Sequence, residues 1–378
     1  MPRIAVIGAG IIGAAIAFRL AERGLDVVLL DRAEPGDGVT STTYAWVNAN
    51  EKLPRAYFDL NVAAMEEYRR LAWRLAPAYW YHASGSLSWY EGAAAAAALA
   101  ARVQRLTGWD YAAELVPAAT VMADLEPGLR GGLADSDTQL GRFPTEAWVD
   151  AVEMTRKLVE STRVAGGRVL TGPEREVVAI ALERERVTAV ELRGGQSLPI
   201  TAVVNAAGNG GPAIAAMVGR TLPMAEAPGL IVHATLPDGA DPLRVPIESD
   251  RFAVRPDGPG RVLLALGVED ATELAAIPPG NLALDHPLVT QLLAWGTALA
   301  PGLASALPVA AVVPLRPMPR DGYPSVGTVP RIGGYFEAIT HSGVTLAPFL
   351  GRAITNMLLG RPPDPLLEPF RPDRPALA

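Results

Sequence analysis

The chain has 378 residues, 49% of them hydrophobic and 19% charged, which is the composition of a folded protein rather than a disordered one. At roughly 150 residues per domain, this length predicts two to three domains or one large α/β unit. The net charge of −7 argues against sequence-independent nucleic-acid binding, which needs a positive face, and the absence of cysteine excludes disulfides, iron–sulfur clusters and thiol nucleophiles.

Neither metal binding nor membrane insertion is expected. The histidines are few and scattered along the chain, so we predict no metal site. The longest apolar run, residues 4–18, is shorter than the ~20 residues that a membrane helix needs. The first residues lack the basic and apolar pattern of a leader, and we therefore expect a soluble, cytoplasmic protein.

The first 31 residues have the pattern of a strand–turn–helix–strand unit. A β-branched run predicts a buried strand over 3–8, and an Ala-rich segment predicts a helix over 11–23, which ends before Gly24. A second buried strand is predicted over 26–31. Such a unit is typical of a parallel sheet with a crossover helix.

The rest of the chain alternates between helical and strand-like segments. After a polar loop around Thr40–Thr43, helical spacing predicts helices over 54–75, 91–106, 145–165, 211–218, 287–300 and 346–359. Strands are predicted over 86–90, 168–170, 175–181, 186–192, 198–204 and 335–340, and the region 223–316 is strand-rich with many Pro and Gly residues.

The first turn carries a G-x-G-x-x-G motif, Gly8-Ala-Gly10-Ile-Ile-Gly13, in the context that gives it meaning. It follows a strand and opens a helix, and the next strand ends in an acidic residue, Asp31. Gly8 permits the tight turn, Gly10 lets the backbone approach a pyrophosphate, and Gly13 lets helix and strand touch. The helix N-terminus attracts phosphate, and Asp31 would accept hydrogen bonds from ribose hydroxyls.

This fingerprint does not distinguish NAD from FAD. Two-nucleotide flavoenzymes usually need a second motif of the same kind for the nicotinamide, and the chain has none; Gly208-Asn-Gly-Gly211 follows a predicted strand but has the wrong spacing. We therefore expect one bound dinucleotide. A turn with no ligand is the plain alternative.

Later segments resemble the D-amino-acid oxidase superfamily of FAD-dependent oxidoreductases, which includes glycine oxidase, sarcosine oxidase and D-amino-acid dehydrogenase. The resemblance covers nearly the whole chain and is most specific in its last two segments. The segments are Thr40–Asn50, Gly141-Arg-Phe-Pro144, Val203-Val-Asn-Ala-Ala-Gly208, Leu315-Arg-Pro-Met-Pro-Arg-Asp-Gly-Tyr-Pro324 with Gly327, and His341-Ser-Gly-Val-Thr-Leu-Ala-Pro348.

With the element order, the resemblance implies an α/β (α+β overall) fold: a Rossmann-like FAD-binding domain with a parallel sheet, and an inserted antiparallel-sheet substrate domain. We expect the FAD-binding domain over 1–75, 141–218 and 317–378, and the substrate-binding domain over 76–140 and 219–316. FAD is the expected cofactor. The implied cofactor contacts are Gly8, Gly10, Ile11, Ile12, Gly13, Asp31, Arg32, Thr40, Ser41, Thr42, Thr43, Trp46, Asn48, Val177, Ala207, Gly208, Ser342, Gly343, Val344, Thr345 and Leu346.

Arg316 is the expected catalytic-site arginine, because it matches the family's carboxylate-binding arginine in its R-P-x-x-x-D-G segment. A planar guanidinium suits a carboxylate, although a structural ion pair is the alternative. The final turn departs from the family: only Ser342 separates His341 from Gly343. That departure puts in doubt any substrate contact that this turn makes in relatives.

Three further residues are candidates for the catalytic site. Lys52 is one of only two lysines and follows the expected flavin loop, so it would meet a substrate acid or negative charge near the ring; a solvated lysine is the alternative. His341 is expected to contact the flavin pyrimidine. Tyr323 is the favoured aromatic wall residue, and weaker candidates for that wall are Tyr79, Tyr81 and His82.

The sequence thus favours a flavin-dependent oxidase or dehydrogenase. It would act on the C–N bond of an amino acid or secondary amine by hydride transfer to flavin N5, giving an imine that hydrolyses. The alternatives are a 2-hydroxy-acid dehydrogenase with the same arginine, a flavin-binding subunit of a larger complex and, least favoured, a nicotinamide dehydrogenase. The expected partner is a small carboxylate or amine substrate, and the oligomeric state is not predicted.

Overall fold

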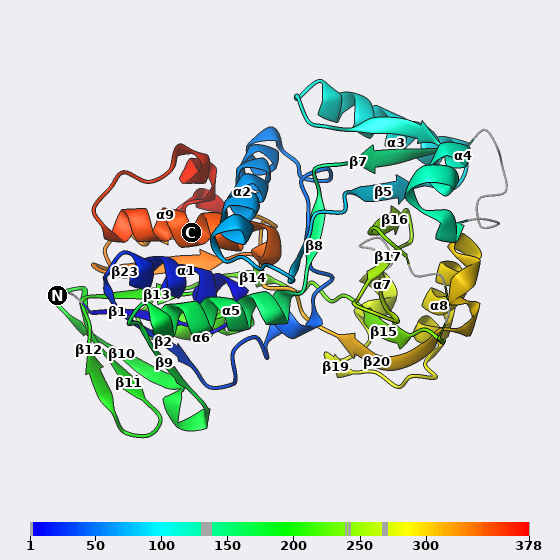
Figure 1. Cartoon of the computed structure of the whole chain (residues 1–378). Helices are drawn as coiled ribbons and strands as arrows, with labels where there is room; N and C mark the ends of the chain where they lie inside the picture. Colours follow the sequence, from blue (N-terminus) through cyan, green and yellow to red (C-terminus); the bar gives the residue numbers. More distant parts are fainter. Residues whose placement is uncertain (1–2, 130–137, 239, 241–242, 267–270, 378) are drawn as a thin grey trace.

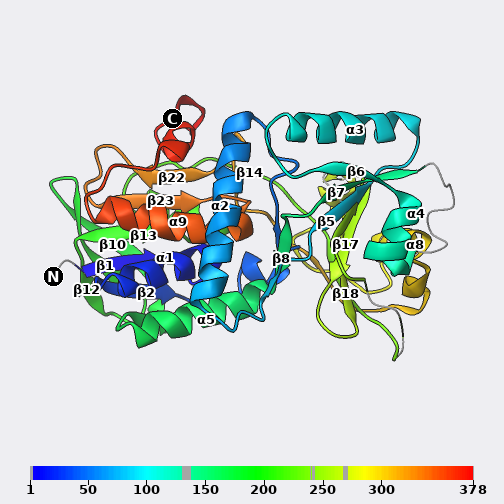
Figure 2. The ribbon, with the colours of Figure 1, turned by 45° about the horizontal axis from the view of Figure 1, so that its top comes forward.

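The computed structural model describes residues 3–129, 138–238, 240, 243–266 and 271–377 as two lobes side by side, each built on its own sheet (Figures 1 and 2). The expected second-domain ranges therefore include residues, such as 130–137, that lie outside the described part. No helix among the described residues is both long and apolar enough to cross a membrane.

The first lobe is built on a six-stranded sheet. Five strands are parallel, and β22 at the edge runs antiparallel to β23. In spatial order the strands are β22 (Ser325–Thr328), β23 (Tyr335–Ile339), β13 (Ala202–Asn205), β1 (Arg3–Ile7), β2 (Asp26–Asp31) and β9 (Arg168–Thr171). Alternate residues of β1 and β2 are buried in different hydrophobic clusters on the two faces, as a doubly covered parallel sheet requires.

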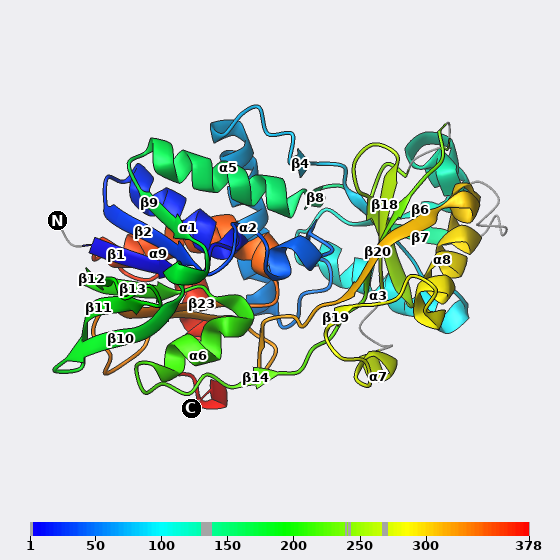
Figure 3. The same cartoon turned by 90° about the horizontal axis from the view of Figure 1, so that it is seen from below.

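Helices cover one face of this sheet and a small antiparallel meander covers the other (Figure 3). The helices are α1 (Ile11–Glu22), α2 (Arg55–Arg74), α5 (Ala151–Val164) and α9 (Gly343–Leu358). The opposite face carries β10 (Val177–Glu183), β11 (Arg186–Leu192), β12 (Ser197–Pro199) and α6 (Gly211–Ala216). Helix α1 packs on both α9 and α5, so the dinucleotide turn at its start is fixed from both sides.

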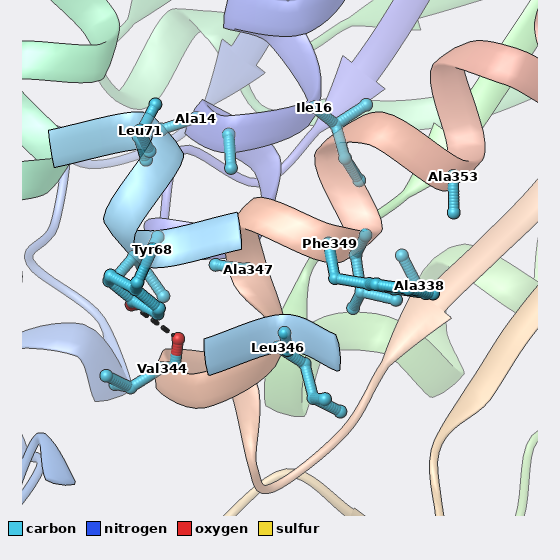
Figure 4. Close-up of a cluster of buried hydrophobic side chains, with 14 of the residues drawn as sticks. Ala14, Ile16, Tyr68, Leu71, Ala338, Val344, Leu346, Ala347, Phe349 and Ala353 are labelled. Atoms are coloured by element: carbon cyan, nitrogen blue, oxygen red, sulfur yellow. Dashed lines mark hydrogen bonds between the residues drawn. The ribbon is translucent and has the colours of Figure 1, made fainter. Parts of the chain in front are cut away.

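Figure 4 shows how α2 is attached to α9. The hydroxyl of Tyr68 donates a 2.6 Å hydrogen bond to the carbonyl of Val344, and Tyr68 is fully buried. Apolar side chains of α1, such as Ile16, and of α9, such as Phe349, belong to the same buried cluster as Tyr68. Because Val344 lies in the first turn of α9, this contact holds the start of the final helix.

The second lobe is a nine-stranded sheet in which only the pairing of β16 with β5 is parallel. In order its strands are β19 (Gly280–Asn281), β20 (Leu307–Val313), β15 (Ile231–Thr235), β18 (Arg261–Leu266), β17 (Phe252–Pro256), β16 (Ile247–Ser249), β5 (Ser86–Trp89), β7 (Gln139–Phe143) and β6 (Glu114–Pro117). Its helices are α3 (Ala93–Thr107), α4 (Ala118–Thr120), α7 (Ala271–Leu274) and α8 (Pro287–Leu299).

Two small sheets complete the fold: β3 (Trp46–Val47) with β8 (Ala147–Val149) and β4 (Tyr81–His82), and β14 (Met224–Ala225) with β21 (Met318–Pro319). The mixed α/β fold class and its parallel sheet are as predicted.

Two of the predicted elements are wrong in part. The predicted helix over 145–165 begins only after Asp150, whose carboxylate accepts the N–H of Glu153 at 2.9 Å, and residues 147–149 form strand β8 instead. The predicted strand over 198–204 is two strands, β12 and β13, that belong to different sheets. In both cases pairing with distant segments decides the local structure.

Candidate active site

The turn between β1 and α1 leaves no room for side chains. Gly8 has φ +108°, and a Cβ at Gly13 would stand 1.8 Å from the carbonyl oxygen of Gly8. Glycine at these positions therefore lets strand and helix touch. At the start of α1, the N–H of Ile11 donates to the hydroxyl of Thr40 at 3.1 Å, so the Thr40 loop lies against the same turn.

Asp31 ends β2 beside this turn. Its carboxylate accepts the N–H of Ala9 at 2.6 Å and the N–H of Ala33 at 2.9 Å, which fixes its orientation. The neighbouring Arg32 forms a long ion pair with Glu176 at 3.5 Å. Glu176 directly precedes Val177, the first residue of β10.

Two adjoining cavities begin at this turn. The first, of about 350 Å³, extends along Gly8, Gly10, Ile11, Ile12, Asp31, Arg32, Thr40, Ala207, Gly208, Thr340 and Gly343. The second, of about 390 Å³, lies between the lobes and is lined by Thr42, Trp46, Asn48, Lys52, Arg316, Ser342 and Thr345 among others. Both cavities are lined by Val39, Thr43, Pro317, His341 and Val344, so they adjoin each other.

Hydrogen bonds join the loop around Trp46 to the start of α9, next to residues that line both cavities. Thr345 donates to the carbonyl of Trp46 at 3.1 Å and accepts the N–H of Asn48 at 3.4 Å. Ser342 accepts a 2.6 Å hydrogen bond from Tyr57 of α2. Segments nearly 300 residues apart in the sequence are thus fixed together where the two cavities meet.

Two half-buried cations line the second cavity, and neither has an anionic partner among the described residues. Arg316 donates through Nε to the carbonyl of Ala227 at 3.2 Å and through Nη2 to that of Pro228 at 3.3 Å. Among the described residues, neither Arg316 nor Lys52 has a carboxylate oxygen within 4.0 Å. Burial lowers the pKa of Arg316 and that of Lys52, where Glu51 acts in the opposite direction.

His341 lies between these cations and the first cavity. Burial, together with the positive charges of Lys52 and Arg316, lowers the pKa of His341 to about 3. The imidazole is therefore neutral at physiological pH. It can donate or accept one hydrogen bond at the boundary between the cavities but adds no charge there.

Two donors on the wall of the second cavity also lack partners. The hydroxyl of Tyr44 and the indole N–H of Trp46 are buried and have no hydrogen-bond partner in the described part of the chain. An unsatisfied buried donor costs about 1 to 3 kcal/mol, so these groups are suited to an acceptor on a bound molecule.

Most of the predicted site residues lie in these two cavities, and a few do not. Gly13 packs against Gly8, Leu346 is buried in the helical core, and Val177 belongs to the core beneath the meander. The Ser41 hydroxyl donates to the carbonyls of Asp37 and Gly38 on the surface. None of these four residues lines either cavity.

The predicted aromatic wall is made by other residues. Tyr323 packs edge-on against Tyr57, Tyr81 stacks on Tyr68, and His82 stacks on Trp148. Tyr79 is exposed. The tyrosines that do line the second cavity are Tyr44 and Tyr90, which the sequence reasoning missed, together with three carboxylates, Glu51, Glu248 and Asp250.

Within the described residues, no group of three or more His, Asp or Glu side chains is arranged to hold a metal ion. The first cavity is lined instead by a glycine-rich turn, by the carboxylate of Asp31 and by the N-terminus of α1. These residues fit a dinucleotide in the first cavity, and Arg316 and Lys52 in the second cavity could bind an anionic group of a small molecule beside it.

This arrangement defines the chain as a dinucleotide-binding protein of the α/β class. The model of the FAD dependent oxidoreductase family, which includes the D-amino-acid oxidases, matches residues 3–357. The chain belongs to this family, and FAD is its cofactor.

Curated relatives match the chain over nearly its full length. Glycine oxidase of Pseudomonas putida is 26% identical, covering 97% of this chain and 96% of the relative. D-amino acid dehydrogenase of Cereibacter sphaeroides is 28% identical, covering 96% of this chain and 93% of the relative.

Solved structures share the fold. Glycine oxidase of Geobacillus kaustophilus superposes with a TM-score of 0.84 at 22% identity, covering 99% of both chains. Iminodiacetate oxidase of Chelativorans superposes with a TM-score of 0.82 at 23% identity, covering 98% of both chains.

Proposed function

We propose that this enzyme oxidises the C–N bond of an amino acid or a secondary amine that carries a carboxylate. The observation that carries this proposal is the pair of half-buried cations, Arg316 and Lys52, in the cavity that adjoins the dinucleotide cavity. Burying a charge without a counterion is costly, so this cavity is suited to an anionic group.

FAD, when bound, supplies a ring that accepts a hydride from the carbon that bears the nitrogen. The residues that would hold it are those of the first cavity, with Asp31 on the ribose and the α1 N-terminus at the pyrophosphate. The backbone N–H groups at the start of α9, in residues 343–345, would stabilise negative charge on the pyrimidine, whereas the N–H of Leu346 already donates to the carbonyl of Ser342 at 3.0 Å.

In the second cavity, Arg316 would bind the substrate carboxylate, because its guanidinium is held by two carbonyls and still presents free N–H groups. Lys52 would add a second positive charge to the wall of the same cavity. Neutral His341 would lie at the boundary between substrate and cofactor without repelling a substrate ammonium group. The oxidised product is an imine, which hydrolyses in water.

The names of the relatives support the same class. Glycine oxidase, D-amino acid dehydrogenase and iminodiacetate oxidase are named for amines that carry carboxylates. The division into a FAD-binding domain and a substrate-binding domain agrees with this proposal, since the second cavity takes walls from both lobes. A cytoplasmic location remains part of the proposal.

Anaerobic mixing of the purified flavoprotein with a panel of compounds tests the function. The panel contains D- and L-amino acids, N-methyl amino acids and 2-hydroxy acids, and the readout is loss of the oxidised flavin absorbance. We expect reduction by amino compounds. Reduction by hydroxy acids alone would instead establish a 2-hydroxy-acid dehydrogenase, and no reduction by any compound would favour a non-catalytic flavin-binding subunit.

A further inference from the structure

The far wall of the second cavity carries two carboxyl groups on one arginine. The guanidinium of Arg102 lies 2.9 Å from Glu51 and 3.2 Å from Glu248, and the hydroxyl of Ser88 donates to Glu248 at 2.8 Å. Arg102 also stacks on Tyr90, at 5.0 Å from the ring centre. Glu51, Glu248 and Tyr90 all line the cavity.

If both carboxyl groups of this cluster were ionised, they would carry one more negative charge than Arg102 neutralises, and the positive charge of Lys52 also lowers the pKa of Glu51. One guanidinium serves two carboxyl groups, and within the described residues Lys52 is not within 4.0 Å of either of them. Burial, with the nearby charge of Glu51, raises the pKa of Glu248 well above its usual range. A carboxyl group that faces a cavity in this state would ionise if a further cation came beside it.

Strand order separates this cluster from Arg316. Glu248, Ala253, Ala265 and Ile231 are paired in one row across β16, β17, β18 and β15, and all four line the cavity. Three strand spacings of ~4.8 Å place the first and last backbones of this row roughly 14 Å apart. Arg316 lies past the far end, where its N–H bonds the carbonyl of Ala227, before β15 begins.

The row between the two ends is made of small side chains, since Ala253 and Ala265 occupy its middle. The α-amino and carboxylate groups of an amino acid are joined through a single carbon. If Arg316 bound the carboxylate and Glu248 bound the α-amino group of the same amino acid, the two side chains would have to lie much closer together than their positions on the sheet allow.

Resting on the proposed function, we propose that Glu248 and Glu51 bind a second cationic group, at the far end of an extended substrate. The substrate class is a basic amino acid, with its carboxylate on Arg316, its aliphatic chain along Ala265 and Ala253, and its terminal ammonium or guanidinium on the carboxyl pair. No bond forms or breaks at this end, and these residues determine specificity.

The test compares substrates that differ only in the distal charge. Lysine and norleucine have the same number of side-chain carbons, and each is supplied as the D- and the L-enantiomer in anaerobic flavin reduction. For the reactive enantiomer, kcat/KM should be about 30-fold or more higher for lysine, because its ammonium group gains charge-assisted hydrogen bonds to the carboxyl pair that norleucine cannot make, worth about 2 kcal/mol. The ratio should fall towards 1 in Glu248→Gln and drop clearly in Glu51→Gln.

Glu183→Gln is the matched control, since Glu183 is an exposed carboxylate on the distant strand β10. It should keep the lysine-to-norleucine ratio of the wild type. A second readout does not depend on turnover: 6-aminohexanoate should perturb the flavin spectrum at lower concentration than hexanoate in the wild type, and Glu248→Gln should remove this difference.

The outcomes separate the two proposals. If amino compounds reduce the flavin but lysine has no advantage over norleucine, the distal cation site is wrong and the proposed function stands. A ratio that stays unchanged in Glu248→Gln, with normal flavin content, would give the carboxyl pair a purely structural role and overturn the inference. If no amino compound reduces the flavin, both proposals fail.

Discussion

The hydroxyl of Thr345 donates to the carbonyl of Trp46 at 3.1 Å, and this contact joins the final helix to the loop that follows the dinucleotide turn. The same hydroxyl accepts the N–H of Asn48 at 3.4 Å. Both Trp46 and Thr345 line the second cavity. One buried side chain therefore sets the separation of two of its walls.

We expect Thr345→Val to lower the free energy of unfolding by about 1 to 3 kcal/mol, because a buried carbonyl and a buried N–H lose their partner. FAD affinity should fall by about tenfold as the two walls separate. Chemical denaturation and FAD titration of the apoprotein measure these effects.

Thr162→Val, which removes a buried hydroxyl bonded only within α5, should cost less than ~1 kcal/mol and leave FAD binding unchanged. Equal effects of both substitutions would contradict the role of Thr345.

Asp31→Asn tests the ribose end of the dinucleotide cavity. The amide keeps the shape of the side chain but loses the charge, so we expect FAD to bind about 10- to 100-fold more weakly, in line with ~1.5 to 3 kcal/mol for hydrogen bonds to a charged group. Quenching of flavin fluorescence on binding gives the affinity.

The control for Asp31 lies at the other end of the same strand. Asp26 forms a half-exposed ion pair with Arg3 at 3.0 Å, and Asp26→Asn should change stability by no more than ~1 kcal/mol and FAD affinity not at all. Unchanged FAD affinity in Asp31→Asn would mean that this carboxylate only orders the turn through Ala9 and Ala33.

Local sequence patterns predicted the first lobe well, because its strands and helices are fixed by short-range periodicity. Gly8, Gly13 and Asp31 could be placed from spacing alone, since the turn, the helix start and the strand end follow one another within 31 residues. Strand β8 could not be predicted in this way: the pairing of Trp148 with Trp46 overrides the helical pattern around it.

Only some of the residues that line the second cavity could be predicted from the sequence. Arg316 and His341 were recognised through a family resemblance rather than through any local pattern. Glu248 lines the second cavity, and its carboxyl group is bound by Arg102 of α3, which is 146 residues away in the sequence. Nothing near Glu248 in the sequence distinguishes it from an exposed carboxylate on a strand. Such contacts depend on how distant segments of the second lobe are brought together.

Arg316→Ala should leave flavin content intact and lower kcat/KM for substrates with a carboxylate by about 100-fold or more, because the anion loses its cationic partner. Arg316→Lys should recover only part of this loss, since an ammonium group lacks the planar fork of a guanidinium. Arg320→Ala provides the control, as Arg320 is an exposed arginine of the same segment. Steady-state kinetics that do not change in Arg316→Ala would remove this residue from the substrate site.

His341 gives a prediction for pH. Its pKa is about 3 in the folded protein and about 6.5 in an unfolded chain, so between these values the unfolded state binds the extra proton. Stability should therefore fall as the pH falls below 6.5. By pH 5 this histidine should account for about 1 to 2 kcal/mol of the loss in the apoprotein. Urea denaturation of the wild type and of His341→Gln at pH 7, 6 and 5 measures the difference, and the variant should lose less stability on acidification. Two curves that remain parallel over this range would show that His341 is protonated as readily in the folded protein as in the unfolded chain.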